Sequence, residues 1–457
     1  MASIGRSPIS ASLLRLDHPV RSLTLAFWLW KALLFIAVVA CPGPGYDTST
    51  TLLSYHDAAS TPDGQAGSLP WALKFARWDS IYFLHIADQG YVFEQEWAFG
   101  YPRLLRWFIL GLRMSGAEGA RGPVNTALVG VVLSHVAHYL SVLALYRLSA
   151  NIFGHGTAAQ KLICFLSAAL HIICPAGAFL LAPYGESIFS LLNLSGFYLY
   201  TSSLISEHNG ITTLRDIQVL TAAMLFALAT IVRSNGILSG FLFAYDAFMV
   251  AWATLIQGPS LHKTRRLAVI IVGGCIVALG MAVPQILAYR SYCMSGTDLR
   301  PWCNSALPSI YGWVQGHYWD VGLFRYWTVS NLPLFLLAAP VLVIMCQSSL
   351  WALKAPSTLR SESGNQSPSP VSPGSMLFRL AVPQGLLAVM ALTSYHVQIV
   401  NRISSGYPVW YWYLVSSAMD SFQDHQKGRR GLVNAAQAMV AYALIQGVLF
   451  GSFLPPA

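Results

Sequence analysis

Long apolar segments separated by short polar joints run through almost the whole chain. Each is close to 20 residues long, the length that a helix needs to cross the hydrocarbon core of a bilayer. The apolar character is continuous within each segment, which predicts membrane helices rather than the alternating strands of a barrel. About eleven spans are predicted, at 22–40, 124–147, 160–182, 185–205, 217–233, 236–256, 267–289, 331–350, 377–394, 407–422 and 433–453.

The composition supports this interpretation. Apolar residues make up 55% of the 457 positions and charged residues 10%, whereas soluble proteins carry about 25% charged residues. The net charge of +9 does not indicate a nucleic acid partner, because the basic residues are scattered over loop ends and form no patch. We therefore predict an all-α polytopic membrane protein in which residues 1–457 form a single integral-membrane domain.

Three segments between the predicted spans differ from the short joints in their length and composition. Residues 41–122 form a long first loop, where aromatic residues at helical spacing predict interfacial helices. Residues 290–330 form a second long polar loop, and residues 351–376 are rich in Ser and Pro, which is typical of a disordered connector. With a cytosolic N-terminus, this connector and the basic joints HKTRR (262–266) and HQKGRR (425–430) face the cytosol, as the positive-inside rule requires.

Because alternate loops lie on alternate sides of the membrane, the same set of spans places all the unusual polar stretches on the opposite, non-cytosolic side. These stretches are RWDSIYFLHIADQGY (77–91), APYGES (182–187), VRSNG (232–236), SIYGWVQGHYWDVGLFRYW (309–327) and HVQIVNRISSGYP (396–408). Unconnected structural loops would be distributed over both faces. We therefore expect the five stretches to form one common site.

Asp79 is the predicted general base of this site. A carboxylate held at a membrane surface is suited to remove the proton from a sugar or alcohol hydroxyl. The alternative is that Asp79 only forms a surface ion pair with Arg77 on an interfacial helix, which would contribute little to stability.

The remaining polar loops supply candidate binding residues. Basic and amide side chains are predicted to bind an anionic phosphate group, because guanidinium groups hold phosphate oxygens in a fork: Arg77, Arg233, His317, Gln315, His396 and Arg402. Sugar or acceptor contacts are predicted for Trp78, Tyr82, Tyr184, Glu186, Asn235, Trp319, Asn401 and Tyr407. Structural roles are the alternative for these residues, including a charge at a helix N-terminus for Glu186, snorkelling for Arg233 and interface anchoring for the aromatic residues.

Nucleotide-binding and metal-binding motifs are missing from the sequence. It contains no phosphate-binding G-x-x-x-x-G-K-[ST] loop, and its seven Cys residues include no C-x-x-C pair. We expect no metal and no cofactor, so the energy for a reaction must be stored in a donor that is reachable at the membrane, such as a lipid-linked phosphosugar. Cys293 and Cys303 share a polar loop and can close a disulfide if that loop lies in an oxidising lumen.

Five blocks of the chain resemble a known family. They are RWDSIYFLHIADQGYVFEQEWAFGYPR (77–103), APYGESIFSLLNLSGFYLY (182–200), RSNG (233–236), VQGHYWDVGLFRYWT (314–328) and HVQIVNRISSGYPVWYWY (396–413). In this order they resemble the GPI mannosyltransferase 2 (PIG-V) family, in particular its fungal members. The likeness extends over nearly the whole chain.

The resemblance implies a multi-pass enzyme of the endoplasmic reticulum membrane with a glycosyltransferase-C-type fold and a luminal active site. Its donor would be dolichol-phosphate mannose and its acceptor the lipid-anchored GPI precursor, which receives the second mannose in α1,6 linkage with inversion. Asp79 matches the acidic residue that members of this fold place in the first luminal loop. The resemblance also implies a small membrane accessory subunit as a partner.

Three other functions are compatible with parts of the sequence. Another dolichol-phosphate-sugar transferase of the same fold, acting in N-glycan assembly, would share all but the last two blocks. A lipid transporter or scramblase would need polar residues in mid-span and a repeat across the two halves, but Lys31 is one of few such residues and no repeat is visible. A purely structural membrane subunit would not depend on Asp79.

Overall fold

The computed structural model describes residues 17–42, 45–53, 69–91, 98–115, 122–294, 300–362, 372–419 and 425–455. Every element assigned within these ranges is a helix. The α-helices are α2 (Pro19–Val39), α4 (Asp79–Gln89), α5 (Gly100–Met114), α6 (Pro123–Phe153), α7 (Ala158–Ile172), α8 (Glu186–His208), α9 (Thr212–Val232), α10 (Gly240–Gln257), α11 (Leu261–Cys293), α12 (Ile310–His317), α13 (Leu332–Glu362), α14 (Pro373–Thr393), α15 (Val400–Ile403), α16 (Val409–Met419) and α17 (His425–Gly451). Short 3-10 helices are η1 (Ser49–Leu53), η2 (Trp71–Phe75), η4 (Gly177–Leu180), η5 (Ser234–Ser239), η6 (Pro301–Asn304), η7 (Val329–Asn331), η8 (Val397–Ile399) and η9 (Ser404–Gly406).

Nine helices among the described residues are long and apolar enough to cross a membrane, and each coincides with a predicted span. They are α2, α6, α8, α9, α10 together with η5, α11, α13, α14 and α17. The all-α polytopic fold predicted from the sequence is therefore confirmed.

The other two predicted spans are not single long helices. Within 160–182, α7 ends at Ile172, and after Pro175 the chain continues as the short helix η4. Within 407–422, α16 begins after Pro408 and has 11 residues, well short of the roughly 20 that cross a bilayer. Proline lacks the backbone N–H of a regular helix and limits helix extension. Hydropathy depends only on the apolar run, and so the prediction overestimated the length of continuous helix in these two segments.

The helices pack into one bundle around α8, which contacts both α6 and α9. In turn α9 packs against α11, and α13 against α14. Helices α9 and α11 come close together at Gly280, where a Cβ atom would lie 2.5 Å from the carbonyl oxygen of Ala227. Only glycine fits at this crossing, and Gly280 also lines the cavity described below.

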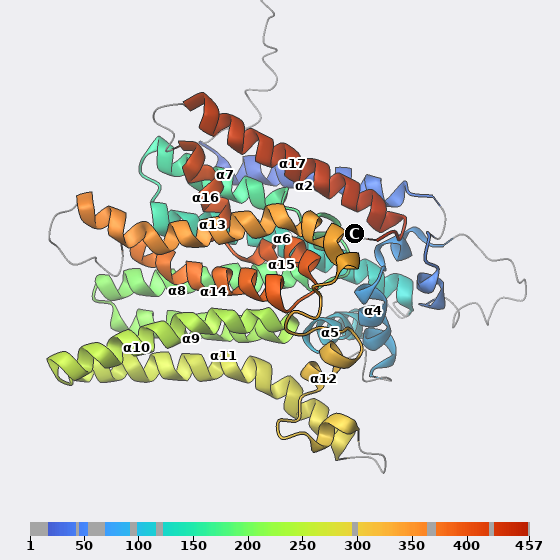
Figure 1. Cartoon of the computed structure of the whole chain (residues 1–457), viewed down its shortest axis with the longest axis horizontal. Coiled ribbons are helices and arrows are strands. Elements are labelled where there is room, and N and C mark those ends of the chain that lie inside the picture. The colour runs from blue at the N-terminus through green and yellow to red at the C-terminus, as the bar shows by residue number, and fades with distance from the viewer. Residues whose placement is uncertain are drawn as a thin grey trace, which may run out of the picture.

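The shorter polar elements gather beyond one end of the bundle. Helices α4, α5 and α12 lie together at this end, to the right in Figure 1, where α17 and the C-terminus also arrive. Helices α4 and α5 lie within the predicted first loop (41–122), and their position in the membrane interface stays a prediction. This end of the bundle, called the cavity end below, carries the candidate site.

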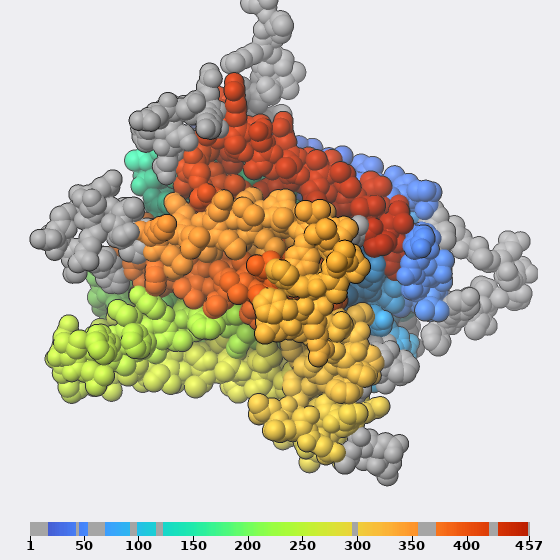
Figure 2. All heavy atoms as spheres, in the orientation of Figure 1, coloured from blue at the N-terminus to red at the C-terminus, as the bar shows by residue number. Residues whose placement is uncertain are grey.

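Described residues of the predicted loop 290–330, from the end of α11 through η6 to α12, form a small projection at the cavity end, visible as the yellow lobe in Figure 2. Trp302 and Cys303 are buried there against Ala288 of α11 and Ile310 of α12. The predicted disulfide between Cys293 and Cys303 is present. It ties the end of α11 to η6 and so steadies the start of α12.

The connector predicted at 351–376 differs from the expectation in nearly its first half. Helix α13 continues to Glu362, so residues 351–362 are helical rather than irregular. The Ser/Pro-rich composition was averaged over the whole stretch, whereas WALK (351–354) alone is a good helix-forming continuation of the preceding apolar span. Residues 363–371 lie outside the described part, and α14 begins at Pro373.

Candidate active site

A cavity of about 380 Å³ lies at the cavity end of the bundle, within the range usual for small-molecule sites. Each of the five polar stretches contributes to its lining, as the sequence predicted. Eight of the predicted site residues line it: Asp79, Tyr82, Arg233, Asn235, Gln315, Trp319, His396 and Arg402. Segments more than 300 residues apart in the chain thus form a single site.

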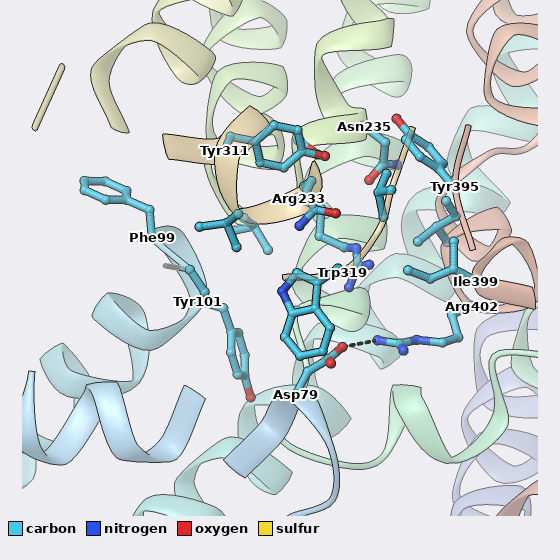
Figure 3. A pocket seen from close by; sticks show the side chains of 18 of the residues that line it. Asp79, Phe99, Tyr101, Arg233, Asn235, Tyr311, Trp319, Tyr395, Ile399 and Arg402 are labelled. Atoms are coloured by element: carbon cyan, nitrogen blue, oxygen red, sulfur yellow. Dashed lines mark hydrogen bonds and ion pairs between the residues drawn. The ribbon is translucent and has the colours of Figure 1, made fainter. Parts of the chain in front are cut away.

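Asp79 is the first residue of α4. The partial positive charge of a helix N-terminus favours a carboxylate at this position. Its side chain is 43% exposed and points into the cavity beneath the indole of Trp319 (Figure 3). The carboxylate is therefore accessible to a substrate.

The guanidinium group of Arg402 connects two carboxylates. Its Nη2 lies 3.2 Å from Asp79 Oδ2 and 2.6 Å from Glu186 Oε1, and its Nε donates to Glu186 Oε1 at 2.8 Å. The aromatic rings of Phe179 and Tyr184 flank it at 4.0 and 5.0 Å from the guanidinium carbon. Burial acts to lower the pKa of Arg402, but the carboxylates of Glu186 and Asp79 outweigh it and raise the pKa above its ordinary value. Arg402 is a permanent cation with a fixed orientation.

Glu186 is a buried carboxylate that holds two arginines at once. Its side chain is fully buried, and Oε1 accepts both Arg402 and Arg233 Nη1, the latter at 2.8 Å. Its other oxygen, Oε2, has no hydrogen-bond partner among the described residues. Glu186 does not line the cavity, so its observed position fits the orientation of Arg233 and Arg402 better than the sugar contact predicted from the sequence.

Six other predicted site residues do not line the cavity: Arg77, Trp78, Tyr184, His317, Asn401 and Tyr407. Two of them support lining residues from behind. The hydroxyl of Tyr407 donates to the carbonyl oxygen of Asn235 at 3.0 Å, and the amide of Asn401 donates to the hydroxyl of Tyr442 at 2.9 Å.

His317 lies on the exposed surface of the projection, where its ring stacks on Trp313 at 4.3 Å. The side chain of Arg77 is buried, and it donates to Thr50 Oγ1 and to the carbonyl oxygen of Gly451, both at 2.9 Å. The carboxylate of Asp79, which the alternative reading paired with Arg77, instead forms the ion pair with Arg402.

The arrangement can bind an anion next to an accessible carboxylate. Arg233 and Arg402 supply two cations at the cavity wall, and Trp319 and Tyr82 supply aromatic faces that meet edge to face at 6.4 Å. His396 Nε2 donates a hydrogen bond to the carbonyl oxygen of Trp319 at 2.7 Å, which connects two loops that line the cavity. Among the described residues no group of three or more His, Cys, Asp or Glu side chains is arranged to hold a metal ion.

Comparison with known protein families shows what kind of protein this is. The family model described as Mannosyltransferase (PIG-V) matches residues 30–457. The chain belongs to the PIG-V mannosyltransferase family. It is therefore an enzyme of the glycosyltransferase class, and the transporter and structural-subunit alternatives no longer apply.

Individual relatives are similar to this chain over most of their length. The chain is 53% identical over 455 residues to "GPI mannosyltransferase 2" of Aspergillus oryzae, with 98% of each chain covered. It is 51% identical to the protein of the same name from Aspergillus fumigatus, with 96% of this chain and 94% of that protein covered. Against the protein of that name from Schizosaccharomyces pombe the identity is 29%, with 84% and 74% covered.

Among solved structures, the chain is similar to an oligosaccharyltransferase from Archaeoglobus fulgidus. The TM-score is 0.47 at 11% sequence identity, and the similarity covers 95% of this chain and 56% of that one.

Several residues that line the cavity were not predicted from the sequence. Gln285 lines the cavity from α11, and Tyr442 and Gln446 line it from α17. They lie inside long apolar runs, which predict only membrane spans. An amide within a membrane helix usually faces the interior of the bundle, and this signal could have identified Gln285 and Gln446.

Proposed function

We propose that this chain transfers mannose from dolichol-phosphate mannose to the 6-hydroxyl of the first mannose of the GPI precursor, which creates the second mannose in α1,6 linkage. Membership of a mannosyltransferase family supports the transfer of mannose. The name GPI mannosyltransferase 2 of the relatives supports the acceptor. The observation that carries the proposal is the accessible carboxylate of Asp79 beside two arginine side chains in one cavity.

In the proposed reaction, the acceptor O6 attacks C1 of the donor mannose while its proton moves to Asp79. The bond between C1 and the phosphate oxygen breaks, and dolichyl phosphate leaves from the opposite face with the electron pair. A single displacement inverts the β-linkage of the donor to the α-linkage of the product. No covalent enzyme intermediate forms, so the site needs no nucleophile of its own.

Arg402 has two tasks in this scheme. It holds Asp79 through Nη2 alone, whereas Glu186 receives both Nη2 and Nε. A donor phosphate that enters can therefore compete with Asp79 for Arg402 without releasing the guanidinium group from Glu186. This exchange frees the carboxylate to accept the proton, and one preorganised cation at the phosphate lowers the barrier by about 3 to 4 kcal/mol.

The proposal includes a location and partners. The protein would be a multi-pass protein of the endoplasmic reticulum membrane with the cavity end in the lumen. The sugar groups of donor and acceptor would enter the cavity while their lipid tails remain in the bilayer. Because Arg233 and Arg402 can neutralise the phosphate charge, the reaction requires no metal ion. A small membrane accessory subunit is expected to accompany the enzyme.

The experiment is an assay of the purified protein with a synthetic one-mannose GPI acceptor. Dolichol-phosphate mannose and GDP-mannose are supplied separately, and the product linkage is determined by digestion with an α1,6-specific mannosidase. We expect product from the lipid-linked donor only, and complete digestion. Use of GDP-mannose, a linkage that resists the mannosidase, or no transfer to the GPI acceptor would contradict the proposal.

A further inference from the structure

Trp78, immediately before the proposed base Asp79, has an unfavourable backbone conformation. Its φ is 44° and its ψ is −122°, a region that glycine enters readily and a tryptophan does not. Such a conformation persists only where the surrounding structure holds it, and it is often found at functional sites. The turn redirects the chain from η2 into α4, so it sets the direction in which Asp79 enters the cavity.

The side chain of Trp78 packs against the far end of the chain. Its ring meets Phe453 at 5.1 Å and Phe450 at 5.4 Å between centroids, both edge to face. Phe450 belongs to the last turn of α17, and Phe453 is the second residue after this helix ends at Gly451. Both are almost completely buried, so the contact excludes water from one face of the indole.

Arg77 forms a second connection between the same two segments. Its guanidinium group donates to the carbonyl oxygen of Gly451 at 2.9 Å and lies 4.8 Å from the centroid of the Phe453 ring. A cation at this position complements the negative end of the α17 dipole. Burial lowers the pKa of Arg77 to about 10, so the side chain still carries its charge at neutral pH.

The segment after α17 is held by backbone hydrogen bonds and by close packing. The backbone N–H of Tyr46 donates to the carbonyl oxygen of Ser452 at 2.9 Å, and Phe453 and Leu454 donate back to Phe450 and Leu449. At Gly451 a Cβ atom would lie 2.8 Å from both Cys41 Sγ and the Val38 carbonyl oxygen. The C-terminal end of α17 is thus packed tightly against the end of α2.

We propose that the C-terminal end of α17, Phe450 to Phe453, is a positioning element for the catalytic carboxylate. It holds the strained Trp78 turn, and through that turn it aims Asp79 at the acceptor hydroxyl. Arg77 fastens this element to the first loop and does not bind substrate. The inference rests on the proposed role of Asp79 as the base.

The test compares Phe453→Ala with Phe243→Ala, which removes an equally buried ring (2% exposed in both cases) that packs against Phe226 and Tyr200 in the main core. We measure kcat and KM for both substrates per folded enzyme, with the folded fraction taken from size-exclusion chromatography. Phe453→Ala should lower kcat by about 10²-fold, the effect of a misplacement near 1 Å, with KM within twofold. Phe243→Ala should leave kcat unchanged, and Phe453→Leu should restore most of the loss.

The double variant Asp79→Asn/Phe453→Ala separates this inference from the proposed function. If Phe453 acts through Asp79, its removal should cost no further activity once the carboxylate is gone. An unchanged kcat for Phe453→Ala, or a full additional loss in the double variant, would overturn the positioning role. A fully active Asp79→Asn enzyme would instead overturn the role of Asp79 as base.

Discussion

Asp79 and Glu186 are both carboxylates within reach of Arg402, but their surroundings give them different tasks. The side chain of Glu186 is fully buried, while that of Asp79 is 43% exposed. A buried carboxylate is stable only when it is paired, and Glu186 has two guanidinium partners. An exposed carboxylate at a helix N-terminus can exchange its partner for a substrate. Burial therefore separates a positioning group from a candidate base.

The substitution Glu186→Gln tests this division. It keeps the size of the side chain but removes the charge that orients Arg233 and Arg402, so we expect the donor KM to rise by an order of magnitude or more. The free energy of unfolding should fall by about 1.5 to 3 kcal/mol, the usual contribution of a hydrogen bond to a charged group. Donor titration in the mannosyltransfer assay and thermal unfolding in detergent measure the two effects.

Glu207→Gln is the matched control, because Glu207 also pairs with two arginines, Arg215 and Arg266, on helices α9 and α11. It should lose stability while the donor KM stays the same. Equal KM values for Glu186→Gln and the unmodified enzyme would mean that Glu186 does not orient the donor-binding cations.

Sequence reasoning could identify the residues that stand out from their neighbours. Asp79, Arg233, His396 and Arg402 interrupt apolar surroundings in short polar loops, so their type and place both indicated a site. The pairing of Glu186 with Arg402 could not be predicted, since it joins positions 216 residues apart. The orientation of Arg77 away from the cavity depends equally on a distant partner, Gly451.

The elements around the cavity differ in how they are held. Long helices are fixed by burial of apolar surface, whereas α12 has eight residues and few buried side chains of its own. It depends on the small core around Trp302 and on the disulfide between Cys293 and Cys303. Because α12 and the loop after it carry Tyr311, Gln315 and Trp319 into the cavity, the stability of the projection matters for substrate binding.

We expect the double substitution Cys293→Ser/Cys303→Ser to loosen the projection. Closing a loop of this length contributes about 3 kcal/mol to stability, and its loss should raise the acceptor KM more than it lowers kcat. Limited proteolysis of the segment and steady-state kinetics report the two effects. Cys275→Ser, on the same helix α11 but with a free thiol, should behave like the unmodified enzyme. Unchanged proteolysis of the double variant would contradict the role of the disulfide.

The shape of the whole molecule follows from the alternation of its helices. Each crossing reverses the chain direction, so the polar loops after alternate crossings must lie at the same end, and hydropathy was enough to predict this gathering. The alternation of the loops between the two ends is kept although α7 and α16 are shorter than the predicted spans, because each of these helices still connects two long helices. Hydropathy alone did not predict that α17 contributes to the cavity wall, since it does not show which face of a helix turns inward; only the amide of Gln446 within the apolar run carried that signal.

The orientation of the molecule in its membrane is tested by thiol labelling. Leu307 at the cavity end and Leu261 at the start of α11, at the opposite end, are both 87% exposed, which makes Leu307→Cys and Leu261→Cys a matched pair. In sealed microsomes, an impermeant maleimide should label Leu261→Cys at once and Leu307→Cys only after the membrane is permeabilised. The reverse pattern would place the cavity on the cytosolic side and exclude a luminal reaction.

The central claim is that the carboxylate of Asp79 takes the proton from the acceptor hydroxyl. The most direct measurement is the single-turnover rate of purified Asp79→Asn with saturating dolichol-phosphate mannose and one-mannose acceptor, beside donor binding measured separately. Asparagine keeps the size of the side chain but is not a base, so the rate should fall by about 10² to 10⁴-fold while donor affinity stays within a few fold. A rate close to that of the unmodified enzyme would show that the proton leaves by another route.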